Sequence, residues 1–155
     1  MLAELDRSDS LVLEDFVPFR LNRLADAVSV NLSEIYRDRF GLEISEWRVL
    51  VTVGQRRECT AQCIASSTRM HKTRVSRAVA SLEARKLLLR SCNAEDGREM
   101  SIGLTKTGQR MYSDLVPLAL LRERRLLSCL SETERRAFLA AMTRLEEFLD
   151  LSGNG

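Results

Sequence analysis

Catalytic and metal-binding residues are scarce in this 155-residue chain. Its only histidine is His71, and its four cysteines form no Cys-x-x-Cys pair, so a zinc site is not expected. The sequence also has no Gly-rich phosphate loop, no nucleophile elbow and no histidine at a suitable spacing from a serine or cysteine. We therefore expect no catalytic residues, no metal and no bound cofactor, and the chain does not read as an enzyme.

Long apolar runs and aromatic residues are scarce as well. No stretch approaches the roughly 18 apolar residues of a membrane-spanning helix, and the first residues are too acidic and polar for a signal peptide. We expect a cytoplasmic protein with no membrane partner. Hydrophobic residues make up 45% of the chain and aromatic residues only 5%, so we expect a core built mainly from Leu, Val and Ala, which suits helices.

The most informative stretch is 61–104, which predicts a short helix, a turn, a basic helix and a two-stranded hairpin. In the basic helix, Val75, Val79 and Leu82 recur at helical spacing and predict one buried face. The first two turns of its other face carry only cations and hydroxyls, and the first acidic residue is Glu83. A recognition helix presents such N-terminal side chains to base edges in the major groove of DNA. An ordinary basic surface helix is the alternative.

The residues before the basic helix fit a DNA-binding unit. We expect the basic helix over 71–85, a short helix over 62–67 and the intervening turn at 68–70. His71 stands where the N-cap of the basic helix would fall. A neutral capping role is the simpler interpretation of His71, and a pH sensor or a phosphate contact is the alternative.

A β-hairpin is expected after the basic helix. Its first strand starts at Leu87, and residues 93–97 supply turn chemistry, because the Asp-Gly pair tolerates a positive φ. From Met100, apolar residues alternate with small ones, which predicts a half-buried second strand with Met100 and Ile102 on its inner side. Arg98 stands near the tip, where a cation can reach a narrow and electronegative minor groove.

The distribution of charge is more informative than the net charge of +2. Residues 69–98 hold eight Lys or Arg and three acidic residues, a local charge of +5, whereas residues 1–20 hold five acidic residues and two arginines, a local charge of −3. A basic centre between acidic or balanced ends is expected of a DNA-reading lobe beside a separate assembly lobe. A second basic run at 122–125 has Glu123 interleaved and is expected on a solvated or interface face.

Four segments carry a family resemblance: GLEISEWRVL (41–50), IASSTRMHKTRVSRAVASLEARKLLLR (64–90), the Asp96-Gly97-Arg98 wing and GLTKTGQRMY (103–112). Together they resemble the MarR family of bacterial transcriptional regulators over about residues 10 to 150. The resemblance implies a homodimeric winged helix-turn-helix repressor whose DNA affinity is altered by a small ligand, often a phenolic or aromatic compound. It also implies that Arg98 enters the minor groove and that Asp96 holds a basic side chain in place.

This chain departs from the family at Lys86, just after the basic helix, where the family commonly has Gly. A Gly there closes the helix with a left-handed residue, and Lys is expected to adopt the same conformation at a cost of about 1 kcal/mol.

Further helices are expected on both sides of the DNA-binding unit, over 14–40, 44–53, 106–129 and from the capping box at Ser131 onward. Gly41 fits the end of the first of them, and residues 54–58 are expected to link the second to the DNA-binding unit. The helices near the chain ends carry broad apolar stripes with no sheet to cover them. Packing against a second copy is the expected solution, and a self-contained bundle is the alternative.

The expected fold class is mainly α with a small β-hairpin wing, in which a winged helix-turn-helix lobe joins a helical dimerisation lobe formed by the N- and C-terminal helices. Residues 1–40 are the expected N-terminal dimerisation region, 41–106 the DNA-binding lobe, and 107–155 the C-terminal helices that complete the dimerisation lobe. Two recognition helices related by a two-fold axis would lie about 34 Å apart, so the partner is expected to be double-stranded DNA with an inverted repeat.

Eight residues are expected to contact DNA. Those that read bases are Thr73, Ser76 and Arg77. Lys72 and Arg74 are expected to hold the phosphate backbone. The set is completed by Arg69, Asp96 and Arg98.

The effector suggested by the family resemblance is an aromatic acid or its coenzyme A thioester. Arg20, Asn22 and Arg23 lie on a helix whose other face is apolar, and guanidinium groups suit the carboxylate or phosphate of such a ligand. A plain surface position is the alternative for these three residues. Trp47 is the fourth candidate for the ligand site, although a Trp on the apolar face of a helix usually belongs to the core. The ligand is expected between the two lobes.

Two further functions stay open. In the first, one or more of Cys59, Cys63, Cys92 and Cys129 senses oxidants. Cys59 and Cys63 stand four residues apart and could form a redox pair, although small apolar packing is the simpler interpretation. In the second, the winged helix binds a protein, which predicts apolar or acidic residues at 73, 76 and 77 in place of those present. The sequence names neither the effector, the operator, the regulated genes nor the sign of regulation.

Overall fold

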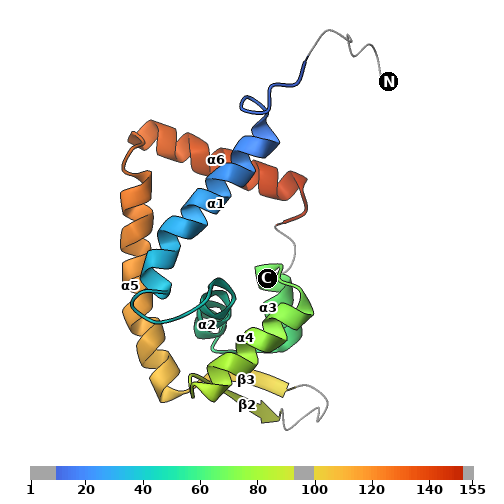
Figure 1. The fold of residues 1–155 in the computed structure, drawn as a ribbon, viewed down its shortest axis with the longest axis vertical. Coiled ribbons are helices and arrows are strands. Elements are labelled where there is room, and N and C mark those ends of the chain that lie inside the picture. The colour runs from blue at the N-terminus through green and yellow to red at the C-terminus, as the bar shows by residue number, and fades with distance from the viewer. Residues whose placement is uncertain (1–9, 93–99, 152–155) are drawn as a thin grey trace, which may run out of the picture.

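The computed structural model describes residues 10–92 and 100–151, and it confirms a mainly helical fold with a small antiparallel sheet (Figure 1). The helices are α1 (Val17–Tyr36), α2 (Ile44–Arg56), α3 (Ala61–Thr68), α4 (Lys72–Ala84), α5 (Lys106–Leu127) and α6 (Glu132–Phe148). The strands are β1 (Glu58–Cys59), β2 (Leu88–Cys92) and β3 (Met100–Leu104). The hairpin turn expected at 93–97 lies outside the described residues.

Helices α2, α3 and α4 pack with the sheet into a lobe that has its own apolar core. The strand order is β1-β3-β2, with both pairs antiparallel, and β3 places Ile102 opposite Cys59. Leu50 of α2, Ile64 of α3 and Leu82 of α4 are fully buried in this core. Burying each such side chain stabilises the fold by about 1.5–3 kcal/mol, so apolar packing fixes the winged helix-turn-helix unit.

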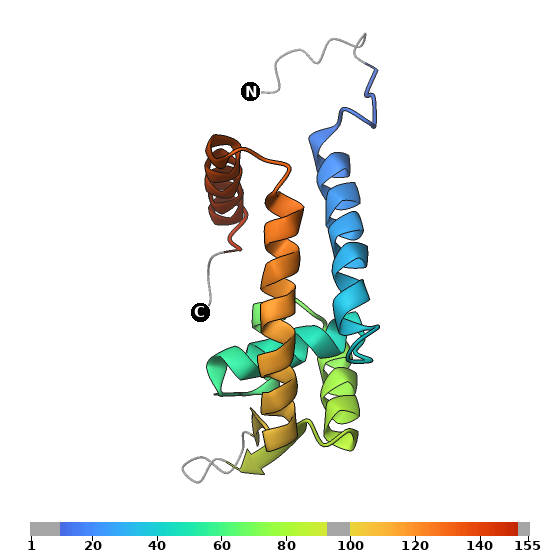
Figure 2. The ribbon, with the colours of Figure 1, turned by 90° about the vertical axis from the view of Figure 1, so that its left-hand side faces the viewer.

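Helices α1 and α5 extend from this lobe toward the other end of the molecule (Figures 1 and 2). The two helices are joined by an ion pair in which Arg122 of α5 donates to a carboxylate oxygen of Glu34 in α1 at 2.9 Å. Arg122 also donates to Asn31 Oδ1 at 3.5 Å, so the second basic run contributes contacts inside the chain through this residue. Near the middle of α5, Leu115 is fully buried and joins the core of the winged lobe.

Helix α6 stands apart from the other helices. It crosses α1 in Figure 1, but the turned view of Figure 2 places it on the opposite side of α5 from α1. Its predicted capping box is confirmed, because the Ser131 hydroxyl accepts from the Glu134 backbone N–H and Glu134 Oε2 accepts from the Ser131 backbone N–H at 2.8 Å. None of its residues is buried. Its predicted apolar stripe is exposed in the single chain: Phe138, Leu139, Met142 and Leu145, with Leu149 just beyond the helix.

The predicted bounds of the first helix, 14–40, are wrong at both ends. The helix begins at Val17 because the fixed φ of Pro18 suits a first helical turn. It ends at Tyr36, and residues 37–40 form turns that close at Gly41, whose φ is +60°. Gly41 therefore ends the turn that follows α1, rather than the helix itself.

The predicted link over 54–58 is wrong in part. Helix α2 continues to Arg56, and Glu58 and Cys59 form β1 against β3, a strand of which the sequence gives only a weak sign. On β3, Ile102 is buried as predicted, but Met100 is 44% exposed. Met100 pairs with Cys92 at one end of the β2–β3 pair, beyond the two residues of β3 that pair with β1.

Within 10–92 and 100–151, no helix has both the length and the apolar character needed to cross a membrane.

Candidate nucleic-acid interface

The N-terminus of α4 is fixed by its N-cap residue. His71 Nδ1 accepts a hydrogen bond from the backbone N–H of Thr73 at 3.3 Å and lies 3.1 Å from the Thr73 hydroxyl. The expected capping role of His71 is therefore confirmed. The preceding turn depends on Arg69, whose left-handed backbone (φ +53°) redirects the chain from α3 into α4.

Helix α4 has one buried and one exposed face, as the sequence predicts. Val75, Val79 and Leu82 are at most 1% exposed. The five predicted DNA contacts of the helix are all exposed and cluster in its first two turns: Lys72, Thr73, Arg74, Ser76 and Arg77. Apolar burial on one side therefore presents cations and hydroxyls together on the other.

The cations on and after α4 fall into two groups. Toward its C-terminus two arginines have partners in the protein: Arg90 Nε lies 3.1 Å from Glu83 Oε1, and Arg85 donates to backbone carbonyls. Over the described residues, the side chains of Lys72, Arg74 and Arg77 form no hydrogen bond or ion pair with the protein. Their charge lies at the positive end of the helix dipole and is available to phosphate groups.

The remaining predicted DNA contacts are not part of this cluster. Arg69 is exposed, and its guanidinium donates to the backbone oxygen of Asp150 at 3.2 Å, so it is held by the segment that follows α6. Asp96 and Arg98 lie outside the described residues, and the role of the wing stays a prediction.

Lys86 adopts the left-handed conformation expected from its position, with φ +59°. Its backbone N–H donates to Glu83, and the N–H of Leu87 donates to Leu82 at 2.9 Å. These bonds close α4 and direct the chain into β2 without the usual glycine.

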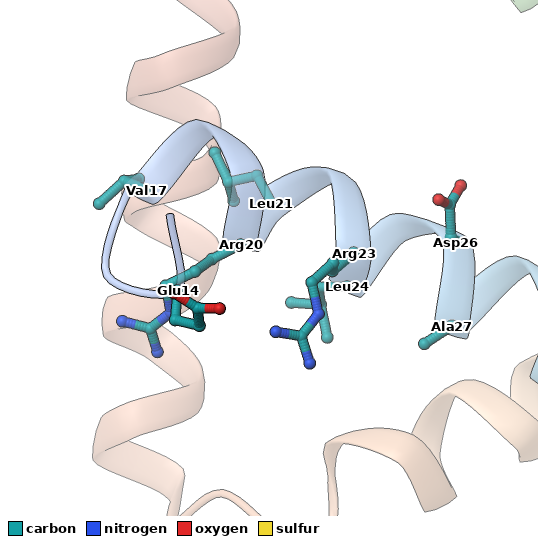
Figure 3. Close-up of a pocket in the computed structure, with 8 residues that line it drawn as sticks. All are labelled: Glu14, Val17, Arg20, Leu21, Arg23, Leu24, Asp26 and Ala27. Carbon is teal, nitrogen blue, oxygen red and sulfur yellow. The ribbon is translucent and has the colours of Figure 1, made fainter. Parts of the chain in front are cut away.

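The predicted ligand residues are not brought together. Arg20 and Arg23 line an open groove of about 740 Å³ along α1, and Figure 3 shows both side chains on the same side of the helix. Asn22 is exposed and is not among the residues that line this groove. Trp47 lines a different hollow, of about 280 Å³, between α2 and the end of α3.

Trp47 has a structural partner in the protein. Its ring stacks on that of Tyr36, with 5.7 Å between centroids and 1° between planes. Tyr36 is buried, and this burial raises its pKa. Trp47 is half-buried against the core, in keeping with the simpler interpretation of its position.

The cysteines differ in exposure. Cys59 is buried, and loss of hydration, with a smaller contribution from neighbouring Cys63, raises its pKa to about 11. A thiol with such a pKa is almost entirely protonated at neutral pH, which disfavours attack on an oxidant. Cys92 and Cys129 are exposed. In the part of the chain that the structure describes, no group of three or more His, Cys, Asp or Glu side chains could hold a metal ion.

Sequence reasoning missed three residues that hold α4 to the rest of the protein: Glu46, Ser81 and Arg85. A weak signal existed for Glu46, because a glutamate three residues after a helix start is the second half of a capping box. Ser81 and Arg85 gave no signal, since their partners lie 35 and 44 residues away in the sequence.

Comparison with known proteins matches the central part of the chain to a family model. Residues 40–99 match the model described as the MarR family. These residues span α2 to the wing and include the exposed cluster of α4. Among curated protein sequences, none matches this chain.

Solved structures with the same fold cover nearly the whole chain. A MarR/EmrR family transcriptional regulator from Acinetobacter sp. ADP1 is 28% identical, with 91% of this chain and 99% of that chain covered and a TM-score of 0.81. MepR of S. aureus, in complex with DNA, is 25% identical, with coverages of 87% and 99% and a TM-score of 0.76. BpsR of Bordetella bronchiseptica, whose DNA binding is regulated by 6-hydroxynicotinic acid, is 21% identical, with coverages of 89% and 98% and a TM-score of 0.80.

Proposed function

Since this chain is a MarR-family transcriptional regulator, we propose that it is a homodimeric repressor that binds an inverted repeat and leaves DNA when it binds a small aromatic acid or the coenzyme A thioester of such an acid. The observation that carries the proposal is the exposed cluster at the start of α4, where Lys72, Arg74 and Arg77 have no partners in the described part of the protein.

The chemistry of this cluster suits DNA. Arg77 can pair bidentately with guanine, and the hydroxyls of Thr73 and Ser76 can meet bases or phosphates. Lys72 and Arg74 flank them and suit the phosphate backbone. The same five positions do not suit a protein-binding winged helix, which would present apolar or acidic side chains. A related fold binds DNA in the MepR complex.

A homodimer is supported by the uncovered apolar faces. All of α6 is at the surface, with Leu145 at 49% and Phe148 at 84% exposure. On α1, Leu21 and Leu24 are about half exposed beside the groove. Exposed apolar patches of this kind are typical of protein interfaces, and a second copy with the same faces gives a closed, two-fold assembly.

The effector class is supported by the arginines on α1. Figure 3 shows the side chains of Arg20 and Arg23 on the same side of α1. Together they present two guanidinium groups that could bind the carboxylate of a ligand. BpsR, which shares the fold, responds to 6-hydroxynicotinic acid, an aromatic acid. A ligand of this kind releases DNA only if it binds better to the dimer geometry that does not fit the operator.

The test is fluorescence anisotropy of the purified protein on the DNA upstream of its own gene, repeated with a panel of aromatic acids and their thioesters. We expect tight, salt-sensitive binding that one compound releases. Binding that peroxide abolishes and no compound affects would favour redox sensing instead. Failure to select any sequence from a pool of random duplexes would contradict the proposal.

A further inference from the structure

Glu46, in the first turn of α2, is the only charged side chain that the structure buries among the residues it describes, with 8% exposure. Its Oε2 accepts from the backbone N–H of Glu43 at 2.8 Å, and its Oε1 accepts from the hydroxyl of Ser81 in α4. A buried carboxylate is unfavourable unless its oxygens are hydrogen-bonded. The carboxylate therefore holds the C-terminal half of α4 to the start of α2.

Arg85, the C-cap residue of α4, extends this connection to α1. Its guanidinium donates to the backbone oxygens of Phe40 at 2.8 Å and Gly41 at 2.9 Å. Its Nη1 also lies 3.9 Å from Glu46 Oε2. Phe40 and Gly41 belong to the turn after α1, so one side chain at the end of α4 contacts both this turn and the buried carboxylate of α2.

These contacts lie at the end of α4 opposite the DNA-facing cluster. The cluster occupies the first two turns, whereas Ser81 and Arg85 lie in the last turn and at the cap. An arginine that binds two carbonyl oxygens is fixed in direction as well as distance, because its donors form a rigid fork. The contacts therefore fix the angle of α4 relative to α1 without occupying the residues that face DNA.

We propose that Glu46, Ser81 and Arg85 are positioning residues that set the distance and angle between the two recognition helices of the dimer, and hence the half-site spacing that the protein accepts. The inference rests on the proposed function, because it requires a dimer that binds an inverted repeat. It adds that three residues without DNA contact determine one property of the operator.

Loss of these contacts should change the preferred half-site spacing of the operator more than it changes the stability of the fold. The Arg85 side chain is 35% exposed, so water can replace it at the Phe40 and Gly41 carbonyls. Water molecules at these carbonyls would not hold α4 at a fixed angle to α1, as the Arg85 guanidinium does. Ser81→Ala removes a different contact of the same set and is the milder second variant.

The experiment uses an operator that the full-length wild-type protein selects from random duplex DNA. Half-site spacing is then changed in single base-pair steps, each of which moves one half-site by about 3.4 Å and rotates it by about 35°. For wild type we expect affinity to fall at least about tenfold on either side of the best spacing. For Arg85→Ala we expect weaker binding at the best spacing and less than about a threefold difference between neighbouring spacings.

Two controls separate position from charge and stability. Arg39→Ala removes an exposed cation from the turn next to Gly41, and over the described residues the Arg39 side chain has no hydrogen bond or ion pair, so its spacing profile should match wild type. Arg85→Lys can restore one of the two carbonyl contacts and should give an intermediate profile. Ser81→Ala should broaden the profile without a change in secondary structure.

Equal weakening at every spacing, with the optimum as sharp as in wild type, would overturn the inference and leave Arg85 with a role in stability or charge alone. That result would leave DNA recognition itself intact. If the wild-type protein selects no operator at all, the proposed function fails first and this inference fails with it.

Discussion

Gly54 of α2 lies directly against the ring of Tyr112 in α5, so that a Cβ atom at position 54 would come within 2.4 Å of Tyr112 Cδ2. The absence of a side chain lets α5 pass close to α2, and α5 is the helix that leaves the winged lobe beside α1. This contact therefore joins the DNA-reading lobe to the helices expected to form the dimer.

Gly54→Ala should destabilise the protein by about 1–3 kcal/mol, because the added methyl group overpacks a close helix contact. Urea unfolding would measure the loss. Gly103→Ala is the matched control, since a Cβ there meets nothing nearer than 3.7 Å. Combining Gly54→Ala with Tyr112→Ala should cost less than the sum of the two single changes. Additive losses would show that the contact is not the cause.

Lys86→Gly should stabilise the protein. Lys86 has φ +59°, and glycine relieves about 1 kcal/mol of left-handed strain. Thermal unfolding would show a higher Tm. Lys86→Ala removes the same charge but keeps the Cβ atom, so it should show no such gain. If Lys86→Ala stabilises the protein as much as Lys86→Gly, charge and not backbone conformation is responsible.

The capping box of α6 should make its helix sensitive to acid. Hydrogen bonds from the Ser131 hydroxyl and backbone hold the pKa of Glu134 below its ordinary value of 4.5. A lowered folded-state pKa gives a contribution that is present above the ordinary pKa and lost as pH falls through the lowered value. The stability difference between wild type and Glu134→Gln should therefore shrink as pH falls from about 6 to about 3.

Helicity and urea unfolding across that pH range would measure this effect. Glu146→Gln, which changes another exposed glutamate of α6, is the control and should differ little from wild type at any of these pH values. A gap between wild type and Glu134→Gln that stays constant down to the lowest pH would contradict the role of the ionised capping carboxylate.

The Cys59 thiol should be alkylated more slowly than the exposed thiols of Cys92 and Cys129. Its pKa of about 11 lies two units above the ordinary value of 9.0, which lowers the thiolate fraction about a hundredfold at neutral pH, and burial limits access. Iodoacetamide at neutral pH, followed by peptide mass spectrometry, should label the exposed Cys92 and Cys129 before Cys59. If Cys59 is labelled as fast as Cys92 and Cys129, the hypothesis that Cys59 senses oxidants would again be supported.

Local chemistry made much of the fold predictable. The N-caps of α4 and α6 follow from His71 and Ser131, because a cap binds backbone groups two or three residues ahead. The buried stripe of α4 follows from periodicity. Each of these features depends on neighbours in the sequence. The left-handed conformation of Lys86 was expected from the family resemblance, because the family commonly has Gly at this position.

Contacts between distant segments were not predictable. The partners of Arg85 become visible only when the end of α4 lies against the turn that follows α1, and in the sequence the same arginine resembles any surface cation. Met100 has the right alternation for burial but lies at the end of β3 that β1 does not reach. The residues predicted to bind the ligand were also not brought together, because Trp47 and the arginines of α1 line separate hollows. The apolar face of a helix does not by itself indicate which other element will cover that face.

The measurement closest to the central claim is a salt titration of operator binding by wild type and by Arg77→Ala, with Arg124→Ala as a control that removes a cation from α5. For wild type, the logarithm of the affinity should fall linearly with the logarithm of salt concentration, as phosphate contacts require. Arg77→Ala should bind the operator at least about tenfold more weakly and discriminate less against altered bases, whereas Arg124→Ala should match wild type. Operator affinity that neither salt nor Arg77→Ala changes would contradict the assignment of α4 as the recognition helix.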